Sequence, residues 1–153
     1  ILLVANTDDE RREAVRQLIR IGYDDIRGYL AGGFDAWKAA DFPIISTASL
    51  SVSQLNDWRR QKDAPYVLDV RFAKEWNEGH IRGARHIEGG MIPQLARDLL
   101  RTDRPLVVLC ARGHRSTVAI SLLEQIGFKD LYALEAGYQA WLNAGYETVR
   151  GEE

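Results

Sequence analysis

The chain is poor in the residues that build several common kinds of site. It has one cysteine, three histidines and four prolines in 153 residues. A single cysteine excludes a disulfide framework within the chain and a cysteine-rich metal site, and it favours a reducing compartment. We therefore expect a cytoplasmic protein that holds no metal ion.

Charge and hydropathy exclude further classes. A formal net charge of −2 gives no reason to expect nucleic acid as a partner, since nucleic-acid-binding proteins carry a clustered basic face. No hydrophobic run approaches the roughly 18 residues of a membrane span. The length suits one full domain plus a smaller part. Because the chain begins at Ile1 without a signal-peptide pattern, we interpret it as a piece of a longer polypeptide.

Residues 105–127 form the stretch around which the other segments are arranged. Residues 106–109 are an unbroken apolar run, typical of a strand buried on both faces. Apolar residues at helical spacing follow, and Gly127 suits a helix C-terminus. Cys110 thus lies between a strand and a helix, where open α/β sheets bind ligands. Strands that alternate with helical patterns elsewhere predict a parallel sheet with helices on both faces.

The loop that follows this strand favours a thiolate. Helix N-termini and nearby cations lower the pKa of a thiol, and Arg112, His114 and Arg115 lie within five residues of Cys110. Gly113 allows the backbone to curl so that its N–H groups face an anion. The alternative is an inert, buried cysteine at the end of a strand. The basic surroundings favour the reactive interpretation.

Three ordered motifs resemble the rhodanese family of sulfurtransferases: residues 67–87, the loop at 110–116 and residues 134–141. The resemblance implies an α/β, rhodanese-like three-layer fold with a central five-stranded parallel sheet. It also implies that Cys110 carries sulfur as a covalent persulfide without any other cofactor. The persulfide-binding loop would consist of Ala111, Arg112, Gly113, His114, Arg115 and Ser116. Asp69, Arg71 and Glu75 would support that loop.

Residues 1–44 resemble residues 106–146. Residues 18–23 match 123–128 at an offset of 105, and residues 32–37 match 136–141 at an offset of 104, which is typical of a repeat with one inserted residue. Ala5 stands opposite Cys110, and acids replace the basic loop residues, so this copy would repel an anion. We interpret 1–44 as the C-terminal half of an inactive rhodanese-like repeat, 45–50 as a linker and 51–150 as a complete rhodanese domain. The alternative is an unrelated segment with a chance pattern.

The predicted function is the transfer of sulfane sulfur from thiosulfate or a persulfide to a thiol or another nucleophile through Cys110. Expected partners are small sulfur donors, thiol acceptors and an acceptor protein or upstream catalytic domain, with neither nucleic acid nor a membrane. The tandem arrangement resembles the rhodanese tails of metallo-β-lactamase-fold persulfide dioxygenases. Because a half-sheet has an open edge, we also expect a homodimer or docking of residues 1–44 onto the intact domain.

Two other functions compete with this prediction. Phosphatases and arsenate reductases of related fold carry five residues between the cysteine and the arginine, whereas four separate Cys110 from Arg115. The shorter loop encloses a smaller pocket, which suits a lone sulfur better than a tetrahedral phosphate. A non-catalytic interaction or regulatory module would describe residues 1–44 well and the intact domain poorly. For His80 and His86, we expect hydrogen bonds within a turn rather than metal binding.

Overall fold

The structure of the protein, a computed structural model, describes residues 1–99 and 103–151. The chain divides into two compact units, Ile1–Ser46 and Thr47–Glu153, called the first unit and the second unit below. Each is described by itself.

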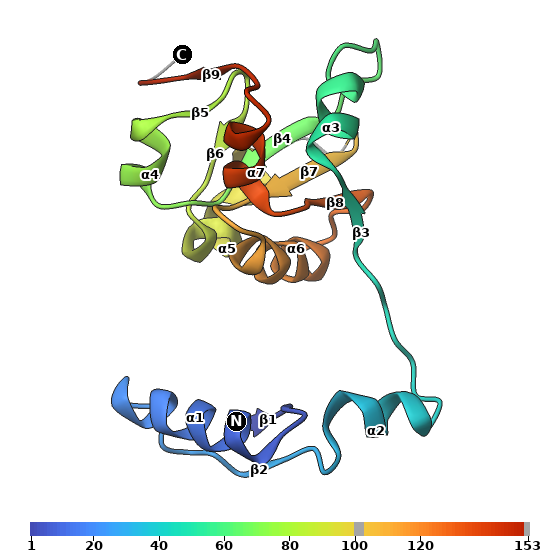
Figure 1. Ribbon diagram of the computed structural model, residues 1–153, viewed down its shortest axis with the longest axis vertical. Coiled ribbons are helices and arrows are strands. Elements are labelled where there is room, and N and C mark those ends of the chain that lie inside the picture. Colours follow the sequence, from blue (N-terminus) through green and yellow to red (C-terminus); the bar gives the residue numbers. More distant parts are fainter. Residues whose placement is uncertain (100–102, 152–153) are drawn as a thin grey trace. The chain divides into compact units, whose positions relative to one another are not determined.

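The second unit contains a five-stranded sheet in the order β3-β8-β7-β4-β6, and every neighbouring pair is parallel (Figure 1). All four residues of the central strand β7 are buried, as its unbroken apolar run predicts. The expected five-stranded parallel sheet is confirmed. Its strands are β3 (Ala48–Leu50), β4 (Tyr66–Asp69), β6 (Arg85–His86), β7 (Leu106–Leu109) and β8 (Leu131–Leu134).

Helices cover both faces of this sheet. Helices α5 (Ile92–Leu99) and α6 (His114–Gln125) lie on one face, and α3 (Val52–Trp58) and α7 (Gly137–Asn143) lie on the other (Figure 1). The side chains of β7 alternate between two core clusters, because successive residues of a strand point to opposite faces. The α6 face receives Leu106 and Val108, and the α7 face receives Val107 and Leu109.

Shorter elements complete the second unit. They are α4 (Ala73–Glu78), the 3-10 helix η1 (Gly89–Met91) and the antiparallel strand pair β5 (His80–Ile81) and β9 (Thr148–Val149). The β5–β9 pair was not foreseen, since two-residue strands show no sequence period. Within the described ranges, no helix has both the length and the apolar character needed to cross a membrane.

The first unit is a small βαβα arrangement. It consists of β1 (Leu2–Leu3), α1 (Asp8–Arg20), β2 (Gly28–Tyr29) and α2 (Gly33–Ala39), and β1 pairs in parallel with β2. Helix α1 begins with a capping box in which Thr7 and Glu10 bond each other's backbone N–H groups. Three acids in its first turn suit the helix dipole.

The linker expected over residues 45–50 is wrong in its second half. Ala48–Leu50 forms the edge strand β3, which pairs with β8. Leu50 packs against the core on the α7 face, so burial of an apolar side chain overrides the loop-like Ser/Thr composition. The boundary between the two units falls between Ser46 and Thr47. Apolar residues at positions 92, 95, 99 and 100 have the spacing of a helix over 92–100. The helix is present from Ile92 to Leu99, and residue 100 lies outside the described residues.

A buried ion pair fixes the turn at the carboxyl end of β4. The side chain of Asp69 is 0% exposed and that of Arg71 is 4% exposed. The Arg71 Nε donates to both Asp69 carboxylate oxygens at 2.9 and 2.8 Å, and its Nη2 donates to Oδ2 at 2.6 Å. The same Nη2 donates to the carbonyl of Gly79 at 2.8 Å. The pair therefore ties the end of β4 to the segment that enters β5.

Replacing Asp69 by asparagine should destabilise the second unit by about 3–5 kcal/mol, because Arg71 would remain buried without a negative partner. Urea unfolding followed by the amide signals of β7 measures this loss. The control is Glu147→Gln, since Glu147 pairs with Arg82 between largely exposed side chains and should cost about 1 kcal/mol or less. Equal losses for the two variants would contradict the role given to the buried pair.

Candidate active site

The Cys110 sulfur lies in a nest of backbone N–H groups. Gly113 N–H donates to its Sγ at 3.1 Å, and the φ of +107° at Gly113 is one that glycine adopts without strain. Burial raises the pKa of the Cys110 thiol, but the N–H groups of Ser116, Arg112 and Gly113 and the Ser116 hydroxyl together outweigh burial and lower this pKa. The thiolate is thus stabilised by dipoles within the loop.

The structure brings the whole predicted loop around one sulfur atom, with one difference from expectation. Helix α6 begins at His114, so the last three predicted loop residues form the first turn of the helix. Ser116 is buried in that turn, where its hydroxyl donates to the Gly113 carbonyl at 2.7 Å and lies 3.8 Å from the Cys110 Sγ. Arg112 and His114 are exposed at the rim.

Arg115 is shared between the cysteine loop and helix α4. Its Nη1 and Nη2 donate to the two carboxylate oxygens of Glu75 at 2.6 and 2.7 Å, in a bidentate pair that spans 40 residues of sequence. The hydrogen bond to Glu75 raises the pKa of Arg115, and the Cys110 sulfur raises it further. The guanidinium also lies 5.0 Å from the ring centroid of Phe72, a residue that the motifs did not single out.

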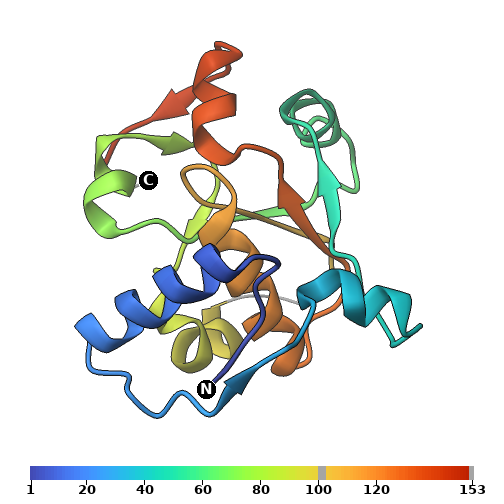
Figure 2. The same ribbon diagram turned by 60° about the horizontal axis from the view of Figure 1, so that its bottom comes forward.

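The start of α7 holds the cysteine loop in place. Tyr138 N–H donates to the Cys110 carbonyl at 2.8 Å, and Gln139 N–H donates to the Ala111 carbonyl at 3.1 Å. Figure 2 shows the start of α7 beside the loop that follows β7. Gly137 has φ +60°, and a Cβ at this position would lie 2.2 Å from the Cys110 carbonyl oxygen. Only glycine therefore permits this approach. The motif that contains Gly137 was noted in the sequence, but its contact with the loop was not.

The buried pair Asp69 and Arg71 reaches the loop through Tyr138. The Arg71 guanidinium carbon lies 3.8 Å from the centroid of the Tyr138 ring, and Tyr138 in turn bonds Cys110 through its backbone N–H. Burial raises the pKa of the Tyr138 hydroxyl. Through Tyr138, the ion pair is thus connected to the backbone of the Cys110 loop.

The two histidines of the β5–β6 region stack on one tryptophan. The Trp76 ring lies 3.4 Å from the His80 ring and 4.9 Å from the His86 ring, measured between centroids. His80 Nδ1 bonds the Trp76 carbonyl, and His86 Nε2 bonds the Arg71 carbonyl. The His80 bond is local, as expected, whereas His86 bonds a carbonyl 15 residues away, just beyond the end of β4. Over the described ranges, no three His, Cys, Asp or Glu side chains gather in a way that could hold a metal ion.

Comparison with known proteins agrees with this geometry. Residues 51–144 match the rhodanese-like domain family. The chain belongs to that family. It is 34% identical over 89 residues to the thiosulfate sulfurtransferase GlpE of Stutzerimonas stutzeri, a match that covers 57% of this chain and 79% of the relative.

Solved structures show the same fold. A rhodanese-related protein from Thermoplasma volcanium superposes with a TM-score of 0.62 and 30% identity, over 68% of this chain and 99% of that one. A thiosulfate sulfurtransferase from Pseudomonas aeruginosa matches 99% of this chain with 33% of its own, at a TM-score of 0.61 and 21% identity. The second likeness concerns the fold alone.

The lowered pKa of Cys110 predicts that its alkylation by iodoacetamide has a midpoint pH below the value of about 8.5 for an ordinary thiol. Ser116→Ala removes the hydroxyl and keeps the N–H, so the midpoint pH should rise only part of the way toward that of an ordinary thiol. Because the folded pKa is below the unfolded one, the thiolate stabilises the fold above about pH 8.5, and this contribution is lost as the pH falls through the folded pKa. A midpoint pH at or above that of free cysteine would contradict the claim that the loop N–H groups lower the pKa of Cys110.

Gly137→Ala should destabilise the second unit and slow every reaction of Cys110, because the new Cβ meets the Cys110 carbonyl. The matched control is Gly145→Ala in the turn after the same helix, where φ is +71° and nothing lies within 4 Å of an added Cβ. That variant should lose only the about 1–2 kcal/mol of left-handed backbone strain. Thermal unfolding and the alkylation rate of each variant measure the difference, and equal effects would argue against a steric cause.

Proposed function

We propose that the protein is a rhodanese-type sulfurtransferase in which Cys110 carries the sulfur as a persulfide. The observation that supports this most directly is the nest of N–H groups around the Cys110 Sγ, which favours an anionic sulfur. The thiosulfate sulfurtransferase activity named for its GlpE relatives is consistent with this chemistry.

In the first half-reaction, the Cys110 thiolate attacks the outer sulfur of thiosulfate. A new S–S bond forms at Cys110 while the bond between the two thiosulfate sulfurs breaks, and sulfite leaves with the electron pair of the broken bond. The negative charge of the Cys110 persulfide then faces the loop N–H groups and the start of α6. A donor persulfide would react in the same way and release its thiol.

In the second half-reaction, an acceptor thiolate attacks the outer sulfur of the Cys110 persulfide. The new bond joins the acceptor to this sulfur, and the Cys110 thiolate leaves with its charge returned to the nest. No net oxidation or external reductant is needed, because one sulfur–sulfur bond replaces another in each step. Arg115 serves both halves by placing a positive charge beside the sulfur.

Access to Cys110 restricts the donors that can react. The cysteine is only 1% exposed, so a donor must present a narrow terminal sulfur atom. Thiosulfate and small persulfides have such an atom. The further hypothesis that Cys110 exchanges sulfur with an upstream domain of metallo-β-lactamase fold rests on the resemblance of the tandem arrangement alone and stays a prediction.

Incubation with thiosulfate should add one sulfur atom, about 32 Da, to the intact protein, and a thiol reductant should remove it. Intact mass spectrometry measures this gain, which should be absent from Cys110→Ala. Because the chain has one cysteine, the site of addition needs no further mapping. Absence of the adduct from wild-type protein with both thiosulfate and a small persulfide would overturn the proposal and leave a non-catalytic module.

Glu75→Gln should reduce the rate of sulfur transfer to a thiol by about 10–100-fold, because Arg115 loses the charged, bidentate partner that orients it. Lys74→Gln on the same helix changes a charge that makes no part of this pair and should leave the rate within about twofold. Steady-state transfer with thiosulfate and a thiol compares the two variants. If the Glu75→Gln variant transfers sulfur as fast as wild type, the orientation of Arg115 by Glu75 plays no part in the mechanism.

A further inference from the structure

The first unit repeats the strand register of the second. In the first unit Leu2 pairs with Gly28 and Leu3 with Tyr29. At the offsets read from the sequence, these become Val107 with Tyr132 and Val108 with Ala133, which are pairs that the second unit forms. Helix α2 corresponds to α7 over its whole length at an offset of 104.

Detailed contacts repeat as well. Trp37 Nε1 donates to the Pro43 carbonyl at 3.1 Å, and its counterpart Trp141 donates to the Glu147 carbonyl at 3.0 Å. Each tryptophan ring has an aromatic neighbour with centroids 4.7 and 4.8 Å away, respectively. A Cβ added at Gly33 would lie 2.7 Å from the Ala5 carbonyl oxygen, as an added Cβ at Gly137 would meet the Cys110 carbonyl. A segment unrelated to the second unit would not be expected to share these contacts with it.

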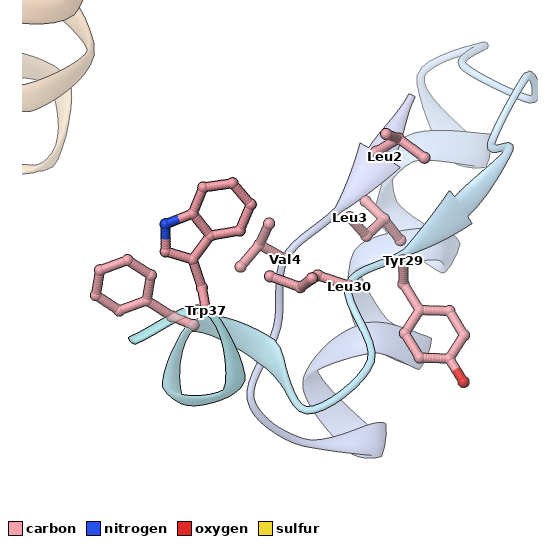
Figure 3. A pocket seen from close by; sticks show the side chains of 7 residues that line it. Leu2, Leu3, Val4, Tyr29, Leu30 and Trp37 are labelled. Atoms are coloured by element: carbon pink, nitrogen blue, oxygen red, sulfur yellow. The ribbon is translucent and has the colours of Figure 1, made fainter. Parts of the chain in front are cut away.

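Equivalent side chains differ sharply in exposure. Leu2 and Val4 are 76% and 61% exposed, whereas their counterparts Val107 and Leu109 are both 0% exposed. Trp37 is 37% exposed and its counterpart Trp141 is 1% exposed. In the first unit these side chains line an open apolar hollow of about 460 Å³, which Figure 3 shows between β1, β2 and α2. No element of the first unit covers it.

In the second unit one contiguous segment covers most of the same face. Strand β3 pairs with the outer edge of β8, α3 places Leu55 in the core with Trp141, and β4 pairs with the edge of β7. All three elements lie within residues 48–69. A strand, a short amphipathic helix and a second strand therefore form most of the cover for this kind of face, and Ile81 of β5 adds to it.

We propose that the apolar face of the first unit, formed by Leu2, Val4, Leu30, Phe34 and Trp37, docks the first half of a rhodanese-like fold. The occupant is a polypeptide segment with a strand, an amphipathic helix and an apolar strand, like residues 48–69. Its first strand pairs with β2 and its second strand pairs in parallel with the free edge of β1. The docked pair is an inactive rhodanese-like repeat, and it does not depend on the chemistry of Cys110.

The backbone of β1 is ready for this pairing. In the second unit, the carbonyl of Leu109, the counterpart of Val4, accepts from the Val70 N–H just beyond the end of β4. In a parallel ladder, alternate residues of a strand direct their backbone groups to the same neighbouring strand. The Leu3 carbonyl, like that of Ile1, is already bonded on the β2 side. Leu2 and Val4 therefore direct their N–H and C=O groups toward the free edge of β1.

The test joins a second copy of residues 48–70 to the N-terminus of the full chain through a Gly/Ser linker of about 20 residues, which spans about 25 Å on average. Such a linker holds the segment at an effective concentration near the millimolar range. Hydrogen exchange resolved by NMR should show the Val4 amide slowed by about tenfold or more relative to the unmodified chain. The protection should be lost in the fusion that carries Val4→Asp.

Matched variants and the unmodified chain complete the test. The fusion that carries Ile45→Asp, at an 88% exposed residue outside the hollow, should keep the protection, and unchanged exchange along α1 shows that Val4→Asp leaves the first unit folded. An unprotected fusion, or equal protection with Val4→Asp, overturns the proposal. Val4 protection in the unmodified chain also overturns it: protection that rises with protein concentration assigns the face to a second copy, and concentration-independent protection assigns it to the second unit.

Discussion

The site depends on the close contact between two backbones at Gly137. The start of α7 can donate to the carbonyls of Cys110 and Ala111 only because no side chain intervenes. Because the carbonyls of Cys110 and Ala111 are bonded to α7, the N–H groups of the loop are directed at the Cys110 sulfur. The core on the α7 face, where Trp141 is buried, fixes the helix and so fixes the loop. The packing of α7 therefore determines the geometry of the hydrogen bonds to the Cys110 sulfur.

The charged residues of the loop are not the main cause of the lowered pKa of Cys110. Three basic residues follow Cys110 within five positions, yet the groups that lower the pKa of the thiol are chiefly backbone N–H groups. Arg115 has its own carboxylate partner in Glu75, and Arg112 and His114 are exposed to solvent, where screening weakens their influence. For the pKa of the Cys110 thiol, the backbone dipoles at short range therefore matter more than the exposed charges of Arg112 and His114.

Much of this arrangement could be predicted from the sequence because it is local. The apolar run of β7, the helix that follows and the loop between them lie within a few residues of one another. Contacts over long separations were different. Glu75 and Arg115 could each be named, but their pairing across 40 residues could not. Strand β3 was missed because its three residues owe their conformation to β8.

Under the proposed function, the burial of Cys110 determines which sulfur of the persulfide an incoming thiol would meet. A disulfide bond is about 2.05 Å long, so the outer sulfur of a persulfide lies well forward of a cysteine sulfur that is itself 1% exposed. An acceptor that attacks the outer atom completes a transfer, whereas one that attacks the inner atom would be trapped as a mixed disulfide with the protein. In the proposed persulfide, the loop around Cys110 would shield the inner atom and leave the outer one as the point of contact. Burial would thus direct an acceptor to the outer sulfur and keep the single thiol of the protein from being linked to that acceptor.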